Sequence, residues 1–277
     1  MTTRNALLKP VLKWVGGKRQ LLDDILPLLP ASPKLYVEPF LGGAAVLLAK
    51  QPRHARVNDY NAELINVYKV IRDEPDELID LLRKHSENNS SEYYYNIRAL
   101  DRFDSFASLD DVTRAARIVY LNKTCFNGLY RVNSAGQVNS PYGRYKNPNI
   151  VNEAGVRALS NYLHGDIELM CGDYAQALQG LPKGSFVYLD PPYMPLNQTS
   201  SFTGYTEGGF SYDEQVRLRD ECVALREQGI HFVQSNSDCE GIRKLYCDFD
   251  IRVVRAKRSI NSKGTGRGAV NEVLIIG

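Results

Sequence analysis

The chain has 277 residues, of which 43% are apolar and 24% charged, a composition typical of a globular protein that can bury a large core. It has no apolar segment long enough for a signal peptide or a membrane span, so we expect a cytoplasmic protein. The five cysteines form no Cys-x-x-Cys pair and the four histidines are scattered, which argues against a disulfide framework and a metal site.

The basic residues are distributed unevenly, although the net charge is only +2. Residues 112–152 and 251–271 contain no acidic residue, whereas the other 22 basic residues of the chain stand against 32 acidic ones. The two stretches carry Arg114, Arg117, Lys123, Arg131, Arg144 and Lys146, and Arg252, Arg255, Lys257, Arg258, Lys263 and Arg267. A solvated basic face would explain either stretch alone, but two such stretches indicate contact with a polyanion.

The first predicted helix, at residues 19–29, has amphipathic apolar spacing. Before it, Gly16-Gly17-Lys18 looks like part of a phosphate-binding loop. However, Leu12 and Arg19 occupy the positions where that motif needs Gly and Ser or Thr. Trp14, the single tryptophan, either packs in the core or covers a ligand beside the flexible glycines.

The next segment predicts a strand, a glycine turn, a helix and a second strand. Strand 34–38 leads into turn 39–43, helix 44–50 follows, and strand 55–58 ends in Asp59. The glycines let a ligand approach the backbone, and the N-terminus of the helix offers free N–H groups. An acidic residue after the second strand of such a unit commonly holds a ribose. The unit therefore predicts a site for an adenosine-like ligand.

Four predicted helices follow, separated by polar turns, at 62–73, 75–84, 93–103 and 110–121. No strand alternates with them. We therefore expect residues 61–150 to form a helical domain, inserted between the two parts of a catalytic domain at 1–60 and 151–277.

The helical segment ends in the acid-free loop 122–148, which is rich in Asn, Gly and Tyr. Side chains of Asn, Tyr, Arg and Lys reach base edges and phosphates, and Phe126, Leu129 and Tyr130 could wedge between bases or stack on them. The loop therefore predicts a nucleic-acid-binding surface.

The strand pattern resumes after a helix at 152–163. Strands are predicted at 167–171, 186–189, 232–234, 251–254 and 273–276, with a helix at 213–227. Together these elements predict an α/β sheet. Residues 194–210 show no periodicity, and for a loop of this length we predict a lid over the site.

Strand 186–189 ends in Asp190-Pro191-Pro192-Tyr193, and open α/β sheets bind ligands at the carboxyl ends of their strands. Because neither proline donates a backbone hydrogen bond, the Asp190 carboxylate and the Pro191 carbonyl stand as acceptors beside the Tyr193 ring. Acceptors next to a flat aromatic face suit a planar group with an exocyclic amine, such as adenine. The alternative is a strand-ending turn with a solvated Asp.

Seven motifs along the chain resemble, in the same order, those of the bacterial and phage DNA adenine-N6 methyltransferases of the Dam type (D12 class), which act at GATC. The matching segments are 12–18, 37–40 with the glycines that follow, 58–59, 121–131, 141–146, 190–193 and 258–262. Two positions depart from the family pattern. Ala44 replaces the second glycine of the F-x-G-x-G turn, and Phe126 stands where a hydroxylated aromatic is frequent.

The resemblance implies a Rossmann-like methyltransferase sheet with an inserted helical target-recognition domain. It also implies S-adenosylmethionine as the cofactor, no metal, and a monomer that acts on double-stranded DNA. Catalysis would involve Asp190, Pro191, Pro192 and Tyr193. The cofactor would contact Trp14, Lys18, Glu38, Pro39, Phe40, Gly42, Gly43, Asp59, Asp173 and Asp190. DNA would contact Lys13, Lys123, Phe126, Asn127, Leu129, Arg131, Pro141, Arg144, Tyr145, Lys146, Arg258 and Ser259, with Lys13 and Arg131 placed to read base pairs.

Adenine N6 is a poor nucleophile because its lone pair is delocalised into the ring. Hydrogen bonds from the amine to Asp190 and to the Pro191 carbonyl would concentrate electron density toward the methyl donor, once the base has flipped out of the duplex. Cytosine C5 methylation would need a nucleophilic Cys, typically after Pro, and the chain has no Pro-Cys dipeptide. Two alternatives stay open: a catalytically silent DNA-binding regulator, and a methyltransferase for RNA or another amine.

Overall fold

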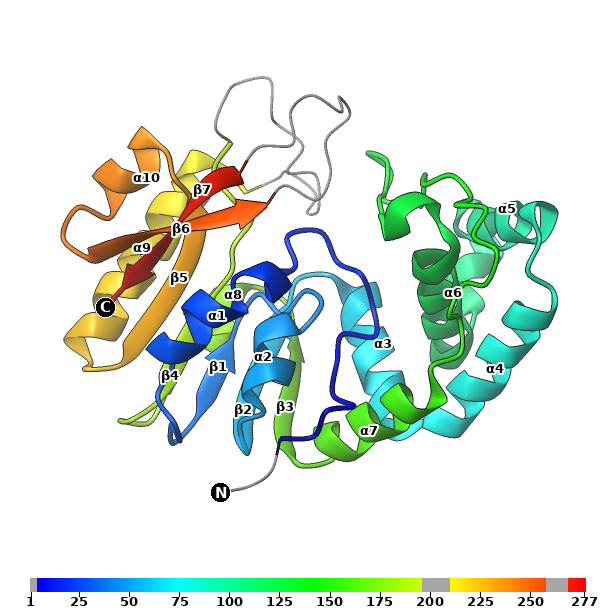
Figure 1. Cartoon of the computed structure of the whole chain (residues 1–277), viewed down its shortest axis with the longest axis horizontal. Coiled ribbons are helices and arrows are strands. Elements are labelled where there is room, and N and C mark those ends of the chain that lie inside the picture. Colours follow the sequence, from blue (N-terminus) through cyan, green and yellow to red (C-terminus); the bar gives the residue numbers. More distant parts are fainter. Residues whose placement is uncertain (1–3, 196–209, 258–268) are drawn as a thin grey trace.

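The computed structural model describes residues 4–195, 210–257 and 269–277. In this part of the chain, seven strands form one sheet in the order β3-β2-β1-β4-β5-β7-β6 (Figure 1). Strands β1 to β5 are parallel, and β7 runs antiparallel to β5 and β6. The strands are β1 (Tyr36–Glu38), β2 (His54–Asp59), β3 (Asp166–Cys171), β4 (Phe186–Leu189), β5 (His231–Ser237), β6 (Asp250–Lys257) and β7 (Ala269–Ile276). The predicted α/β fold is confirmed, and each predicted strand is present.

The strands β1 and β4 are buried along their whole length, with Glu38 as their one charged residue, because both faces of the sheet are covered. Successive side chains of a strand point to opposite faces, so Tyr36 and Tyr188 lie in one hydrophobic core. Val37, Val187 and Leu189 lie in the other. This packing holds the carboxyl ends of β1 and β4 side by side.

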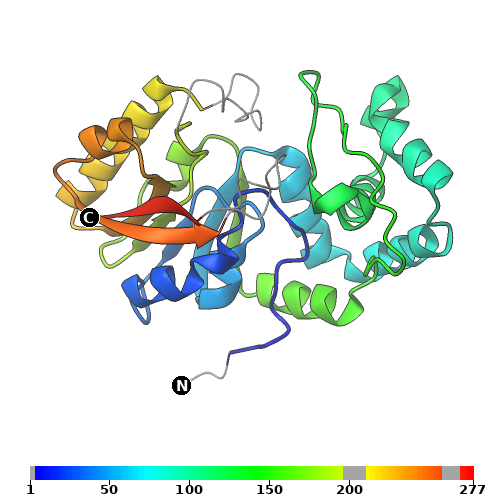
Figure 2. The ribbon, with the colours of Figure 1, turned by 45° about the horizontal axis from the view of Figure 1, so that its top comes forward.

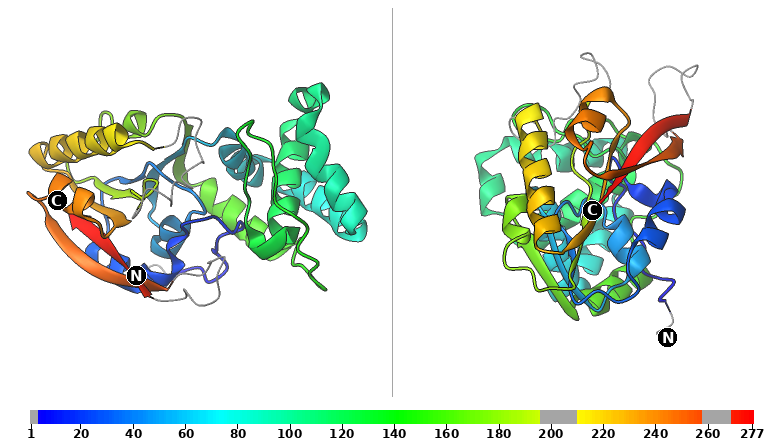
Figure 3. Two further views of the ribbon diagram at one scale, coloured as in Figure 1. Left: turned by 90° about the horizontal axis from the view of Figure 1, so that it is seen from above. Right: turned by 90° about the vertical axis from the view of Figure 1, so that its left-hand side faces the viewer.

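Helices cover both faces of the sheet (Figures 1 and 3). On one face, α1 (Leu22–Ile25) and α2 (Ala45–Lys50) pack into the first core. On the other face, α8 (Tyr174–Ala177), α9 (Tyr212–Glu227) and α10 (Glu240–Leu245) pack into the second. Within the described ranges, no helix is long and apolar enough to cross a membrane.

A helical lobe connects β2 to its parallel neighbour β3 (Figures 1 and 2). Its helices are α3 (Ala62–Asp73), α4 (Pro75–Glu87), α5 (Ser91–Ala99), α6 (Asp111–Thr124) and α7 (Glu153–Leu163). Asn61, Asp110 and Asn152 cap α3, α6 and α7 by accepting hydrogen bonds from backbone N–H groups of the first turn. The buried residues of α3, α4 and α6 belong to the same core as Tyr36, so the lobe is packed continuously with the sheet.

Some predicted elements differ in extent from the structure. The helix predicted at 19–29 is broken into two 3-10 turns, Lys18–Gln20 and Leu26–Leu28, on either side of α1. Pro27 has no backbone N–H to donate to an α-helix at this point. The helices α8 and α10 were not predicted, because four and six residues carry little periodicity. Most of the predicted lid, residues 196–209, lies outside the described residues.

Candidate active site

Asp190 follows β4 directly, at the carboxyl edge of the sheet. Its Oδ1 atom lies 2.7 Å from the Lys18 ammonium and accepts a hydrogen bond of 2.9 Å from the Ser235 hydroxyl at the end of β5. Burial raises the pKa of Asp190 above its ordinary value, although the Lys18 charge and the Ser235 hydrogen bond each lower it. The carboxyl group is therefore held in place by contacts from two other segments of the chain.

The corner after Asp190 is fastened to neighbouring elements. The Pro192 carbonyl accepts a hydrogen bond of 2.9 Å from the Gln215 side chain of α9. The Met194 N–H donates to Asn236 Oδ1 at 3.1 Å, and the Ser237 hydroxyl donates to the Met194 carbonyl at 2.6 Å. The polar end of β5 thus holds the proline corner rigidly.

Tyr193 is half-buried beside this corner, and its hydroxyl donates to Glu272 of β7 at 2.7 Å. The Lys18 ammonium lies 4.6 Å from the centre of the Tyr193 ring and also donates to the Gly16 carbonyl at 2.5 Å. Lys18, only 6% exposed, therefore sits between the carboxylate of Asp190 and the ring of Tyr193.

A pocket opens beside Asp190 at the carboxyl end of β1. Its walls are Trp14, Val15, Gly16, Gly17, Lys18, Glu38, Leu41, Gly42, Gly43, Ala45, Val46 and Asp190. Six of the residues predicted to bind the cofactor are thus gathered around one space. They are Trp14, Lys18, Glu38, Gly42, Gly43 and Asp190.

Glu38 is the most deeply buried acid of the pocket, with 2% of its surface exposed. The Tyr36 hydroxyl donates to its Oε2 atom at 2.7 Å. Burial, reinforced by the negative charge of Asp190, raises the pKa of Glu38 to about 8, although the hydrogen bond from Tyr36 and the charge of Lys18 oppose this rise. A positively charged ligand beside these two acidic groups would lower their raised pKa values and favour their ionised forms.

The turn between β1 and α2 forms one wall of this pocket. Gly42 has φ +49°, and a Cβ there would lie 3.1 Å from the Trp14 ring, so the turn packs closely on Trp14. The Gly42 N–H donates to Asp59 Oδ2 at 2.8 Å, while Asp59 Oδ1 accepts from the Asn61 N–H at 2.9 Å. Ala44, which stands where the family has a glycine, also adopts a left-handed conformation with φ +57°.

The remaining predicted cofactor residues, Pro39, Phe40, Asp59 and Asp173, are not among the residues that line the pocket. The Pro39 carbonyl accepts from the Asn58 side chain at 3.0 Å. Phe40 packs against Tyr174, with ring centres 5.1 Å apart. Asp173 caps α8 and forms a two-bond ion pair with Arg217 of α9, both bonds being 2.8 Å.

The predicted DNA-binding loop folds back on itself through two antiparallel bridges, Cys125 with Tyr142 and Val132 with Val138. Most of its predicted contact residues are exposed, and Lys123 and Leu129 are half-buried. The exposed ones are Phe126, Asn127, Arg131, Pro141, Arg144, Tyr145 and Lys146, together with Lys13 from the N-terminal segment. Arg258 and Ser259 lie outside the described residues.

Three residues of this region have roles that the sequence did not indicate. Tyr130, expected as a possible wedge, is buried and stacks on Trp14 with ring centres 5.4 Å apart. Arg114 pairs with Glu63, so its charge is used inside the lobe. Arg117 is only 2% exposed. Its burial could not be expected from the sequence, because the number of charges in a segment does not show which side chains are buried.

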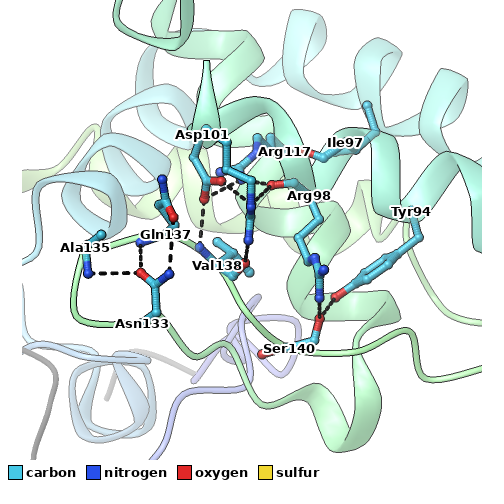
Figure 4. A network of polar contacts seen from close by, with 11 residues as sticks. Tyr94, Ile97, Arg98, Asp101, Arg117, Asn133, Ala135, Gln137, Val138 and Ser140 are labelled. Atoms are coloured by element: carbon cyan, nitrogen blue, oxygen red, sulfur yellow. Dashed lines mark hydrogen bonds and ion pairs between the residues drawn. The ribbon is translucent and has the colours of Figure 1, made fainter. Parts of the chain in front are cut away.

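Arg117 belongs to a polar network that supports the loop (Figure 4). It forms an ion pair of 2.7 Å with Asp101, and the Asp101 carboxylate also accepts from the Val138 N–H at 2.7 Å. Tyr94 and Arg98 donate to the Ser140 carbonyl at 2.9 and 3.0 Å. Backbone groups in the second half of the loop are thus bonded to α5 and to Asp101, which Arg117 of α6 holds in place.

Several contributing residues were not identified from the sequence. Ser235 and Glu272 hold Asp190 and Tyr193, and only the strand order brings them there. Arg19 is exposed and lies near Lys123. The pKa of Lys123 is lowered by burial and, to a smaller extent, by the positive charges of Arg19 and Lys13. The polar run Ser235-Asn236-Ser237 at the end of an apolar strand was the one available signal.

The order of the strands reverses between β1 and β4, and the pocket lies at this point, where open α/β sheets commonly bind their ligands. Residues 14–260 match the family described as D12 class N6 adenine-specific DNA methyltransferase. The chain belongs to this family and is a DNA adenine methyltransferase.

Relatives match along almost the whole chain. It is 46% identical to the Type II methyltransferase M1.LlaDCHI of Lactococcus lactis subsp. cremoris, over 97% of this chain and 95% of the relative. It is 41% identical to the Type II methyltransferase M.MjaIII of Methanocaldococcus jannaschii, over 97% and 98%. It is 36% identical to the DNA adenine methylase of Escherichia coli K12, over 96% and 94%.

Proposed function

We propose that this enzyme transfers a methyl group from S-adenosylmethionine to N6 of an adenine flipped out of duplex DNA, within the sequence GATC. The arrangement that carries this proposal is the Asp190 corner, which shares one pocket with Glu38 and the glycine turn. We further propose a cytoplasmic monomer in which residues 61–150 are the target-recognition domain.

The residues of the pocket fit S-adenosylmethionine. The backbones of Gly42 and Gly43 lie so close to Trp14 that an added Cβ would come within 3.1 Å of it, so glycines keep this wall thin. The Asp190 carboxylate complements a cationic ligand, and a positive charge bound beside Glu38 would lower the raised pKa of Glu38 and so favour its ionised form. When bound there, S-adenosylmethionine supplies the electrophilic methyl group. Asp59, whose oxygens already accept two backbone hydrogen bonds, has lone pairs left for a ribose.

Asp190 is the residue that we assign to the adenine amine. Its carboxylate and the Pro191 carbonyl would accept the two N6 hydrogen bonds, while the base stacks on Tyr193. Lys18 now contacts both Asp190 and the Tyr193 ring, so its ammonium would have to move aside when the base enters. Ser235 and the fastened corner keep the acceptors in place during that exchange.

For recognition, we assign base contacts to Lys13 and Arg131 and backbone contacts to the exposed basic side chains of the loop. Arg131 is oriented by a 2.8 Å hydrogen bond from its Nε to Asn139 Oδ1. The assignment of GATC rests on the motif resemblance and on relatives named DNA adenine methylase. Other similar proteins are named Type II methyltransferases without a stated site, so the site needs its own test.

The test is transfer of labelled methyl groups to three duplexes and an RNA. One duplex contains a single GATC, the second replaces one base pair of that site, and the third replaces its adenine. We expect transfer to the first alone, and none to any substrate with Asp190→Ala, which should still bind DNA. Equal transfer to the first two duplexes would exclude GATC while keeping adenine methylation. Transfer to the RNA would point to the RNA methyltransferase alternative.

A further inference from the structure

Asn122, near the end of α6, joins the helical lobe to the N-terminal segment by a pair of hydrogen bonds. Its Oδ1 atom accepts from the Lys13 N–H at 2.9 Å, and its Nδ2 atom donates to the Lys13 carbonyl at 2.7 Å. The side chain is 1% exposed. Asn122 thus satisfies both backbone groups of one residue that is 109 positions away in the sequence.

The side chain of Lys13 is confined from the opposite direction by the predicted DNA-binding loop 122–148, here called the recognition loop. Gly128 has φ +65°, and a Cβ there would lie 2.4 Å from Lys13 Cδ, so the lysine stem runs against the loop backbone. The Lys13 ammonium reaches the Asn127 carbonyl at 3.5 Å. The next residue, Trp14, stacks on Tyr130 of the same loop. In Figure 1, the N-terminal segment, in dark blue, runs between the sheet and the lobe.

The two hydrogen bonds between Asn122 and the backbone of Lys13, here called the clamp, require a side-chain amide. Among side chains of this length, only an amide offers a donor and an acceptor side by side that match the N–H and C=O of one residue. The contact is buried, so removing it leaves two backbone groups unpaired and frees the backbone of Lys13. A lysine that reads a base must hold its register within a fraction of an ångström.

We propose that Asn122 is a positioning residue that holds Lys13 against the recognition loop and thereby sets the enzyme's discrimination at one base pair. The inference rests on the proposed contact between Lys13 and a base. Asn122 acts through the backbone of Lys13, whereas the ammonium of Lys13 makes the contact. The loss of either should therefore relax selectivity at the same base pair.

The experiment measures single-turnover methylation of duplexes in which each base pair flanking the target adenine is replaced in turn. Asn122→Leu and the smaller Asn122→Ser remove the clamp, and Lys13→Ala removes the ammonium while keeping the backbone that Asn122 binds. We expect each variant to lose about tenfold or more of the discrimination at one and the same base pair. The double variant Lys13→Ala with Asn122→Ser should lose no more than Lys13→Ala alone.

Thr124→Val is the matched control. Thr124 is buried in the same helix, and its hydroxyl donates only to the Tyr120 carbonyl one turn earlier, so this variant should keep the discrimination of the wild type. The folding of Asn122→Ser is checked by its thermal melting curve. If this folded variant methylates every duplex more slowly by the same factor, Asn122 is structural only and the proposal is overturned. If Lys13→Ala keeps full discrimination, the assignment of Lys13 fails instead, while methylation by the wild type still establishes the reaction.

Discussion

Glu38→Gln should change how the stability of the ligand-free enzyme depends on pH. Glu38 is 2% exposed, and burial raises its pKa from an ordinary value of 4.5 to about 8. Because the pKa of Glu38 is higher in the folded than in the unfolded state, its contribution to the free energy of unfolding is greatest below pH 4.5. This stabilisation is lost as pH rises through about 8, because the unfolded chain ionises first. Glutamine keeps the shape and an acceptor for the Tyr36 hydroxyl but does not titrate.

The size of the effect follows from the displacement of the pKa. At about 1.36 kcal/mol per unit, the loss amounts to about 3 kcal/mol between pH 4.5 and pH 7, and to roughly 5 kcal/mol above pH 8. Comparison with Glu38→Gln isolates this part from the other titrating groups. The free energy of unfolding of Glu38→Gln, taken relative to that of the wild type, should therefore rise by about 3 kcal/mol between pH 4.5 and pH 7.

The measurement is urea unfolding of both proteins at several pH values between 4.5 and 9, without cofactor. Tyr36→Phe serves as a control with a predicted direction: the Tyr36 hydrogen bond lowers the pKa of Glu38, so its removal should extend the loss of stability to higher pH. A constant difference between the wild type and Glu38→Gln across this range would show that Glu38 is ionised in the folded protein, and would refute the reasoning.

Three further predictions concern other parts of the site. In Lys18→Met, the charge that lowers the pKa of Asp190 is gone, so the acidic limb of kcat/KM should move to higher pH; an unmoved limb would contradict the pairing. Arg131→Ala should relax selectivity at one base pair by about 1–3 kcal/mol in a duplex panel, whereas a uniform loss would mark a phosphate contact. Arg117→Met should lower the free energy of unfolding by about 1–3 kcal/mol, because Asp101 loses its buried partner Arg117 but keeps the ion pair with Arg102 and the Val138 N–H; a urea midpoint like that of the wild type would contradict this.

Elements with long or strongly apolar patterns were predictable from the sequence. The seven strands and α3 to α7 appear close to their expected positions, and the sheet brings Glu38 and Asp190 to one pocket because parallel strands end at the same edge. The breaks around α1 and the short helices α8 and α10 were not predictable, since fewer than two turns give almost no periodic signal.

Partners that meet only through the tertiary fold were not predictable either. Ser235 and Glu272 reach the Asp190 corner because β5 and β7 are neighbours in the sheet, which local sequence cannot reveal. Likewise, a charge count treats Arg117 and Arg131 alike. One is buried in an ion pair and the other is exposed on the loop. The net charge of a segment predicts that it contacts a polyanion, but does not show which of its side chains lie on the contact surface.

The glycines of the N-terminal segment, which look like part of a phosphate-binding loop, form a tight turn. Gly16 adopts φ +78°, and the Gly17 N–H donates to the Trp14 carbonyl at 3.2 Å, so the chain reverses between Trp14 and Lys18. On one side of this turn, Lys13 lies against Asn127 and Gly128 of the predicted DNA-binding loop. On the other side, the Lys18 ammonium returns to the Gly16 carbonyl and to Asp190. A short turn thus connects Lys13, which we assign to reading DNA, with Lys18, which pairs with the carboxylate that we assign to catalysis.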